Sequence, residues 1–203
     1  RKPELGMIPL FMAGDKEFFF HAKKLQKELG VKTVFFCGGN ELEKAPYKFG
    51  FSGVRGGESD QTLINTKLGD LIKLTFYYLK NFAKNPYYIN DSLFDTTLAY
   101  YHTFINNYEF IWLYHYIRWD ESKIVNTIIN EYDWEISSDT DTTWRIGDGT
   151  ASFYNFIYQT MAGFTEDDDF LSNMVREKLI NREEALNRSK EYSKIRVSSI
   201  NEY

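Results

Sequence analysis

The sequence contains a single cysteine, Cys37, among its 203 residues. One thiol cannot form an internal disulfide bond, and such sparse cysteine usage is typical of a reducing compartment, so we expect a cytoplasmic protein. Cys37 closes an apolar run and is expected to pack rather than to react. The three histidines are scattered and have no second cysteine or HxxxH spacing beside them, so the sequence predicts no metal site of the zinc type.

Long hydrophobic runs and an excess of basic residues are also missing. No segment approaches the roughly 20 apolar residues of a membrane span, and the densest run, residues 110–117, is interrupted by His115. Lys and Arg number 24 against 29 Asp and Glu, which gives a formal net charge of −5. Because a polyanion requires a basic face, we expect neither nucleic acid nor a membrane as partner.

Aromatic residues, by contrast, are abundant at 18%, with 17 Phe and 15 Tyr. They suit a stacking surface for bases or sugars, or a bulky core, and aromatic side chains more often serve packing. The hydrophobic fraction of 43% and the charged fraction of 26% are typical of a globular protein.

The first 60 residues predict the order strand, helix, strand. Residues 7–12 form a short apolar run, Asp15 can cap a helix that continues to residue 29, and residues 31–37 are rich in β-formers. Such a unit requires a right-handed crossover onto a parallel sheet. The fold class we expect is therefore α/β, with a parallel α/β part in residues 1–60.

Residues 61–203 predict a mainly helical part, for which the family resemblance described below implies a role in binding a substrate or a partner. Residues 110–117 suit either a strand or a buried helix. Helices are expected at residues 68–82, 93–105, 120–129 and 151–162, and two more begin at the capping patterns Thr165 with Asp168 and Asn181 with Glu184. Residues 166–169 carry four carboxylates, which we interpret as a capped, solvated helix start.

The first candidate site is Gly38-Gly39-Asn40, together with Glu43. In open α/β sheets, ligands bind beyond the carboxyl ends of strands, and this tripeptide follows a predicted strand. Glycines let the backbone approach a ligand, and a carboxylate can hold a metal ion or a ribose hydroxyl. An ordinary tight turn with a solvated glutamate fits the same residues.

The second candidate site is the polar loop at residues 144–150, which contains Arg145 and Asp148. Arg145 can clamp an anion with two hydrogen bonds, and the helix that follows begins with free N–H groups. Alternatively, Arg145 and Asp148 pair with each other and the loop is structural.

Stretches in three parts of the chain together resemble one family. They are Asp15 to Phe19 with Val31 to Glu43 (VKTVFFCGGNELE), then Glu131 to Glu135 (EYDWE), and finally Ser172 to Arg176 followed by Asn181 to Leu186 (NREEAL). The first is similar to the late strands of the PP-loop ATP pyrophosphatases, which have an adenine nucleotide alpha hydrolase-like fold. The other two are similar to the "EYGW" and "SREEAL" segments of the N-acetyl sugar amidotransferases, asparagine synthase-related enzymes of surface-polysaccharide (LPS) biosynthesis.

The resemblance implies a ligase that uses ATP and Mg²⁺. Members adenylate a carbonyl or amide oxygen, release pyrophosphate and let ammonia from a separate glutaminase subunit displace AMP. Gly38, Gly39, Asn40 and Glu43 would then lie near the nucleotide or its magnesium ion. Arg145 and Asp148 would face the acceptor, which follows from their place in the chain. No catalytic residue is assigned.

The sequence departs from the family in its phosphate loop. The S-G-G-x-D-S motif is absent, residues 53–59 hold glycines in another order, and no Cys-x-x-Cys module is present. We therefore expect the C-terminal part of a larger enzyme, which does not activate ATP alone. Two alternatives stay open: a PP-loop enzyme of another product class (sulfur insertion or amino-acid amidation), and a non-catalytic binding or assembly module, which could be a homo-oligomer.

Overall fold

The structure, a computed structural model, describes residues 4–11, 14–38, 42, 47–54, 67–104, 110–135 and 150–202. This part of the chain is mostly helical and contains a two-stranded parallel sheet, in agreement with the α/β class. Its contacts divide it into two compact units: unit 1 lies within residues 1–40 and 46–117, and unit 2 within residues 41–45 and 118–203. The expected boundary near residue 60 lies outside the described residues, whereas the change from unit 1 to unit 2 falls between Ile117 and Arg118.

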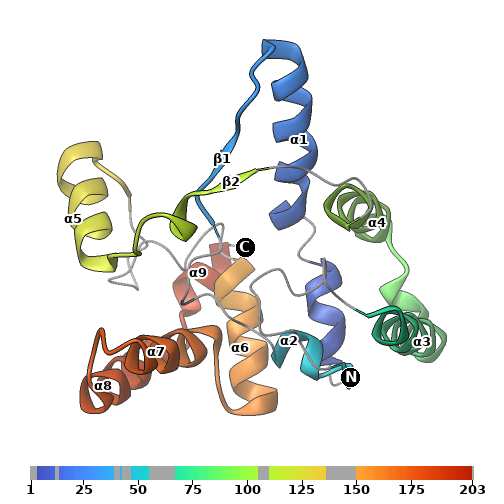
Figure 1. Cartoon of the computed structure of the whole chain (residues 1–203). Helices are drawn as coiled ribbons and strands as arrows, with labels where there is room; N and C mark the ends of the chain where they lie inside the picture. The colour runs from blue at the N-terminus through green and yellow to red at the C-terminus, as the bar shows by residue number, and fades with distance from the viewer. Residues whose placement is uncertain are drawn as a thin grey trace. The chain divides into compact units, whose positions relative to one another are not determined.

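Unit 1 combines helices with the parallel strand pair, and Figure 1 shows the two strands side by side next to α1. Phe35 is opposite Ile111, and Phe36 is opposite Trp112. In chain order, the elements are η1 (Leu5–Phe11), α1 (Gly14–Leu29), β1 (Phe35–Phe36), α2 (Tyr47–Gly50), α3 (Leu68–Lys84), η2 (Pro86–Tyr88), α4 (Asp91–Phe104), β2 (Ile111–Trp112) and η3 (Leu113–His115), where η denotes a 3-10 helix.

The predicted strand at residues 7–12 is wrong. Leu5–Phe11 forms the 3-10 helix η1, and the parallel partner of β1 is β2, from much later in the chain. Pro9 lacks the N–H that a central strand needs, and Gly6 lies so close to the Tyr77 ring that an added Cβ would come within 2.7 Å of Cζ. The second predicted strand is shortened to Phe35–Phe36, the two residues that lie opposite β2 in the parallel register.

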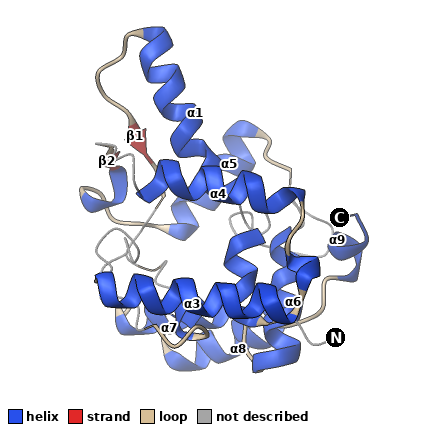
Figure 2. Ribbon diagram, turned by 90° about the vertical axis from the view of Figure 1, so that its right-hand side faces the viewer, coloured by secondary structure: helices blue, strands red, loops and turns tan. Residues whose placement is uncertain are grey.

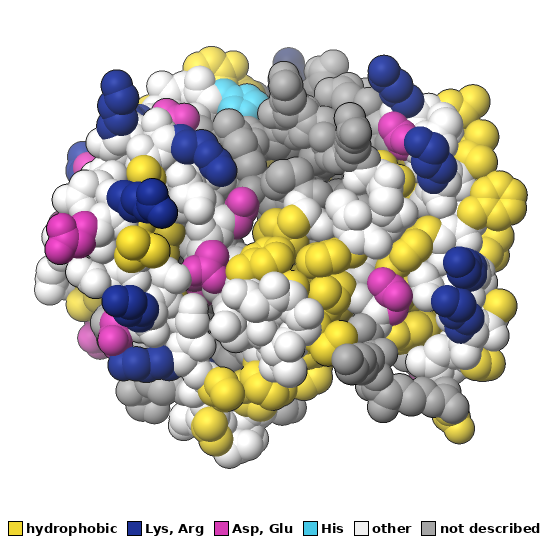
Figure 3. All heavy atoms as spheres, turned by 90° about the horizontal axis from the view of Figure 1, so that it is seen from below, with side chains coloured by type: hydrophobic (Ala, Val, Ile, Leu, Met, Phe, Trp, Pro, Cys, Tyr) yellow, Lys and Arg dark blue, Asp and Glu magenta, His cyan; other side chains and the backbone are white. Residues whose placement is uncertain are grey.

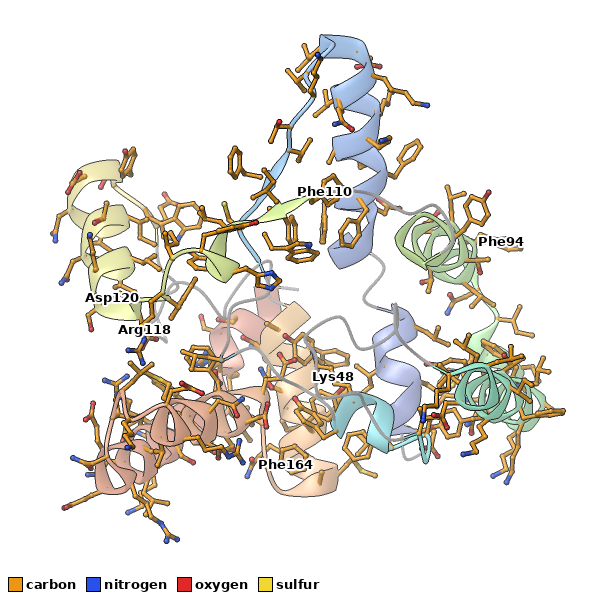
Figure 4. All side chains as sticks on the ribbon, viewed as in Figure 1. Lys48, Phe94, Phe110, Arg118, Asp120 and Phe164 are labelled. Carbon is orange, nitrogen blue, oxygen red and sulfur yellow. The ribbon has the colours of Figure 1, made fainter. Side chains whose placement is uncertain are left out.

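Aromatic rings fill the space between α1 and the strand pair. The Phe36 ring stacks on Phe18 at a centroid distance of 4.8 Å and meets Trp112 edge-on at 4.5 Å. Phe19 stacks on Phe110 at 5.7 Å, and Figure 4 shows Phe110 beside α1. Here the aromatic residues serve packing, which is the commoner of the two expected uses.

Hydrogen bonds attach the N-terminal segment to α3, η2 and α4. The Tyr77 hydroxyl donates to Glu4 Oε1 at 2.7 Å, and the Glu4 N–H donates to the Tyr88 hydroxyl at 3.2 Å. The buried Thr96 hydroxyl donates to the Leu10 carbonyl. Burial, followed by the bond to Glu4, holds the pKa of Tyr77 well above its usual value, because both favour the protonated phenol.

Unit 2 is built from helices, with Leu42 contributed from earlier in the chain. Leu42 is fully buried, and its carbonyl accepts a hydrogen bond from Asn173 Nδ2 at 2.9 Å. The helices are α5 (Glu121–Tyr132), α6 (Thr150–Ala162), α7 (Glu166–Arg176), α8 (Arg182–Tyr192) and α9 (Val197–Glu202).

The predicted helix starts of unit 2 are confirmed by their caps. The Asp120 carboxylate accepts from the Lys123 N–H, and Figure 4 shows Asp120 at the beginning of α5. Thr165 and Asp168 form the expected capping box, in which the Thr165 N–H donates to Asp168 Oδ2 at 2.8 Å. The Asn181 side chain accepts from the Glu184 N–H at 2.8 Å. These bonds satisfy N–H groups that a helix start leaves without partners.

Charged and polar side chains join α5, α7 and α8. Arg188 on α8 contacts Glu121 on α5 at 3.3 Å and Glu184 on its own helix at 2.7 Å. The Ser189 hydroxyl donates to Asp168 Oδ1 at 2.5 Å, which links α8 to the start of α7. Across the described residues, no helix is both long and apolar enough to cross a membrane.

Candidate functional site

The first predicted site falls only partly within the described residues. Gly39, Asn40 and Glu43 lie outside them, whereas Gly38 lies just beyond the carboxyl end of β1. A Cβ at Gly38 would lie 2.7 Å from Cε1 of Phe36, so packing of that ring already requires glycine here. Cys37 is exposed, and the prediction that it packs is therefore wrong, because Cys37 lies beyond the end of β1, whose Phe36 makes the ring contacts of the aromatic cluster.

The second predicted site, Arg145 with Asp148, lies wholly outside the described residues. The expected capping at residues 166–169 is confirmed, but the expectation that this start is solvated is wrong for two of its carboxylates. Glu166 and Asp167 are buried. Glu166 Oε2 accepts from the Tyr154 hydroxyl at 2.5 Å, and the Glu166 N–H donates to Asn155 Oδ1 at 3.0 Å, because α6 packs beside the start of α7.

A hollow in unit 2 opens beside this junction, with about 340 Å³ of empty space when the open solvent at its mouth is included. Three segments form it: one face of α6, the start of α7, and the stretch that joins α8 to α9. The lining residues are Ser152, Asn155, Phe156, Gln159, Thr165, Asp167, Tyr192, Ser193, Lys194, Ile195 and Arg196.

Two of the α6 residues that line the hollow have a buried polar atom without a hydrogen-bond partner among the described residues. Ser152 is only 6% exposed, and its Oγ has no hydrogen-bond partner among the described residues; Gln159 Oε1 is likewise buried without one. A buried polar group that is left without a partner costs roughly 1–3 kcal/mol. Ser152 and Gln159 are two helical turns apart on one face of α6, about 10 Å along its axis. Both residues therefore lie on the side of α6 that borders the hollow.

The charged residues of the lining differ in what they already contact. Lys194 is paired with Glu191 at 2.5 Å. The half-buried Arg196 side chain makes no hydrogen bond or ion pair with any described residue, so its guanidinium can bind a ligand. Together with Phe156 and Tyr192, the hollow offers a hydroxyl, an amide oxygen, a guanidinium and aromatic surface. This set suits a small polar molecule with one apolar side.

Sequence reasoning missed this hollow. Its residues come from three segments that only tertiary packing brings together. A signal was nevertheless present: Ser152 and Gln159 are polar positions seven residues apart, on the packed side of the predicted helix at residues 151–162. Among the described residues, no group of three His, Cys, Asp or Glu side chains is arranged to hold a metal ion.

No protein-family model matches the chain, and neither does any curated protein or solved structure. The hollow of unit 2 and the short family-like segments are therefore the features from which a function can be inferred.

Proposed function

We propose that this chain forms the substrate-binding part of an ATP-dependent amidotransferase or ligase of the PP-loop ATP pyrophosphatase class. The hollow of unit 2 is the proposed site for the acceptor. The observation that carries the proposal is the pair of buried polar atoms, Ser152 Oγ and Gln159 Oε1, which lack partners among the described residues and belong to two residues that line the hollow. An acetamido group offers both kinds of partner, because its N–H is a donor for an amide oxygen such as that of Gln159 and its carbonyl is an acceptor for a hydroxyl such as that of Ser152.

The end of α5 supports the resemblance to the sugar amidotransferases. Asp133 adopts φ 50° and ψ 45°, the left-handed conformation that glycine adopts with least strain. The family segment "EYGW" has glycine at this position, and aspartate is among the residues that tolerate the conformation. The left-handed backbone at the position between Tyr132 and Trp134 therefore suits both the glycine of the family segment and the aspartate of this chain.

The start of α8 supports it in the same way. Asn181 caps the helix where the family segment "SREEAL" has serine. Serine and asparagine are comparable N-cap residues, since each offers a side-chain oxygen to the N–H groups of the first turn. The substitution keeps the local structure.

The strand pair of unit 1 is compatible with a nucleotide site. β1 and β2 run parallel, and Gly38 follows the carboxyl end of β1, where open α/β folds bind ligands. ATP, when bound, would supply the activation of an acceptor oxygen, and a separate glutaminase would supply ammonia. Gly38, Gly39, Asn40 and Glu43 are the residues proposed to hold ATP with Mg²⁺.

Calorimetric titration with N-acetylglucosamine as probe tests the acceptor site. We expect binding that Ser152→Ala and Gln159→Leu each weaken about tenfold, because each removes one hydrogen bond to a buried partner. Thr160→Ala, an exposed position on the same helix, is the matched control and should leave the affinity unchanged. Equal affinity in all three variants, or no binding by the parent chain, would overturn this assignment of the hollow.

A second candidate is the non-catalytic assembly module. The exposed apolar faces of α3 and α4 favour it, because large exposed apolar surfaces usually mark association sites. A chain that associates with a partner but binds neither N-acetylglucosamine nor Mg·ATP would support this candidate over the ligase.

A further inference from the structure

Helix α3 has a buried face and an exposed apolar face. Leu74 and Asn81 are buried on the first. The other carries Ile72, Phe76 and Leu79, which are 49%, 68% and 58% exposed. Their alternating spacing of four and three residues is that of a helix which packs lengthwise along another helix. We call these three residues the α3 seam.

Helix α4 repeats this arrangement. Its inner side packs on α1 and η1, where the Thr96 hydroxyl donates to Leu10. Phe94, Leu98 and Tyr101 lie on the outer side, again four and three residues apart, and are 74%, 54% and 48% exposed. We call them the α4 seam. In Figure 4, Phe94 points away from the rest of unit 1, and in Figure 2 both α3 and α4 run across the side of unit 1 that faces the viewer.

The charged residues around the two seams have opposite sign. Four exposed lysines flank α3 against one aspartate, so residues 67–84 have a net charge of +3 in a chain whose net charge is −5. Figure 3 shows hydrophobic side chains between lysines on the side where α3 lies. Residues 91–104 contain Asp91 and Asp95, with no Lys or Arg, and have a net charge of −2.

Several of these charges have no partner in the described structure. Lys73 is paired with Asp70 at 3.1 Å. Lys80, Lys84, Asp91 and Asp95 form no ion pair with any described residue. They are therefore available to another molecule.

We propose that the α3 and α4 seams form a two-fold symmetric interface between two copies of this chain, in which α3 of each copy packs along α4 of the other. A two-fold interface must be self-complementary, and a face that carries one basic and one acidic seam meets this condition. Each α3 seam then meets an α4 seam, and Lys80 comes near Asp95 of the other copy.

Charge selects this pairing over the others. Two α3 helices packed together would place lysines opposite lysines, and two α4 helices would place aspartates opposite aspartates. Like charges at such positions are destabilising. The crossed arrangement satisfies both seams at once and needs no further partner.

The exposed area is large enough for such a dimer. The six seam side chains expose on the order of 700 Å² in each copy, given the size of aromatic and branched side chains. Stable interfaces of standard size bury roughly 800 Å² on each partner. Neighbouring exposed residues, Tyr87 and Ile89 in and after η2, add to the area.

Sedimentation velocity from low to high micromolar concentration tests the interface. We expect a concentration-dependent dimer that weakens as salt is raised, because the ion pairs are exposed at the rim. Phe76→Asp should raise the dissociation constant tenfold or more, since it places a charge in the centre of an apolar contact. Phe76 is mostly exposed, so circular dichroism should show an unchanged fold.

A charge exchange gives the sharper test. Lys80→Glu should weaken the dimer severalfold, and Lys80→Glu combined with Asp95→Lys should restore it to near the parent affinity. Lys190→Glu, the same change at an exposed position of α8, is the control and should have no effect. A chain that stays monomeric throughout would overturn the proposal. A dimer that tolerates Phe76→Asp, or that the double exchange fails to restore, would overturn it as well, because another surface would then be the interface.

Discussion

The two compact units satisfy their side chains in different ways. Unit 2 joins its helices through polar contacts, such as Ser189 to Asp168 and Arg188 to Glu121. Unit 1 relies on stacked rings around Phe36, and it leaves long apolar faces on α3 and α4 in contact with solvent.

This difference separates two kinds of function. Unit 2 exposes fewer large apolar side chains than unit 1, and two of its buried polar atoms, Ser152 Oγ and Gln159 Oε1, have no partner among the described residues. Such a surplus suits a small polar ligand. The exposed surface of α3 and α4 in unit 1 is apolar with charged residues at its edges, which suits contact with another protein surface.

The largest effect is expected from Phe170→Ala in unit 2. Phe170 is 3% exposed and belongs to the core beneath α7. Its truncation should lower the free energy of unfolding by about 3–5 kcal/mol, because the contacts of the ring are lost and a cavity remains. Urea denaturation followed by circular dichroism measures the loss.

Leu186→Ala, at a mostly exposed position of α8, is the control and should change the free energy by less than about 0.5 kcal/mol. Hydrogen exchange in α3 should stay the same in Phe170→Ala, if unit 1 is stabilised by its own contacts. A uniform rise in exchange through both units would contradict the separation into two bodies.

Local signals in the sequence were sufficient for most of the helices. Spacing predicted α1, α3, α4 and α6, and caps predicted the starts of α5, α7 and α8, with small shifts at their ends; α1 begins at Gly14, before the expected cap Asp15. Asp120 and Asn181 are examples, because an N-cap acts through residues only three positions away. Information of this range is contained in the sequence itself.

Strand partners and the hollow depend on distant residues. The run at residues 7–12 is apolar enough for a strand, but Tyr77 over Gly6 and the missing N–H of Pro9 favour η1 instead. Similarly, nothing close to Ser152 in the sequence indicates that residues 192–196 would lie beside it. Gly39, Asn40, Glu43, Arg145 and Asp148 lie outside the described residues, and their roles stay predictions.

A smaller effect is expected from Gly38→Ala in unit 1. The new Cβ would approach Cε1 of Phe36 to 2.7 Å, so the ring must move within its stack. Overpacking of this kind costs about 1–3 kcal/mol, and the nearby Trp112 should change its fluorescence. The double variant Phe36→Leu with Gly38→Ala should cost less than the sum of its single changes, because leucine vacates the space. Simple additivity would show that Phe36 is not the residue that requires glycine here.

The smallest effect concerns Tyr78 at alkaline pH. Burial raises the pKa of Tyr78 to about 12, against a usual value of 10.0. The folded protein therefore keeps this phenol protonated where the unfolded chain ionises, so the contribution to stability is complete below pH 10 and is lost as the pH rises towards 12. Midway through this window, the free energy of unfolding should have fallen by about 1 kcal/mol less in Tyr78→Phe than in the parent protein. Urea denaturation across this pH range measures the difference.

Tyr87→Phe, at an exposed position, should follow the parent curve. If Tyr78→Phe follows the parent curve as well, the inner side of α3 is open to solvent, and the contrast between its buried and exposed faces, on which the dimer interface depends, is lost.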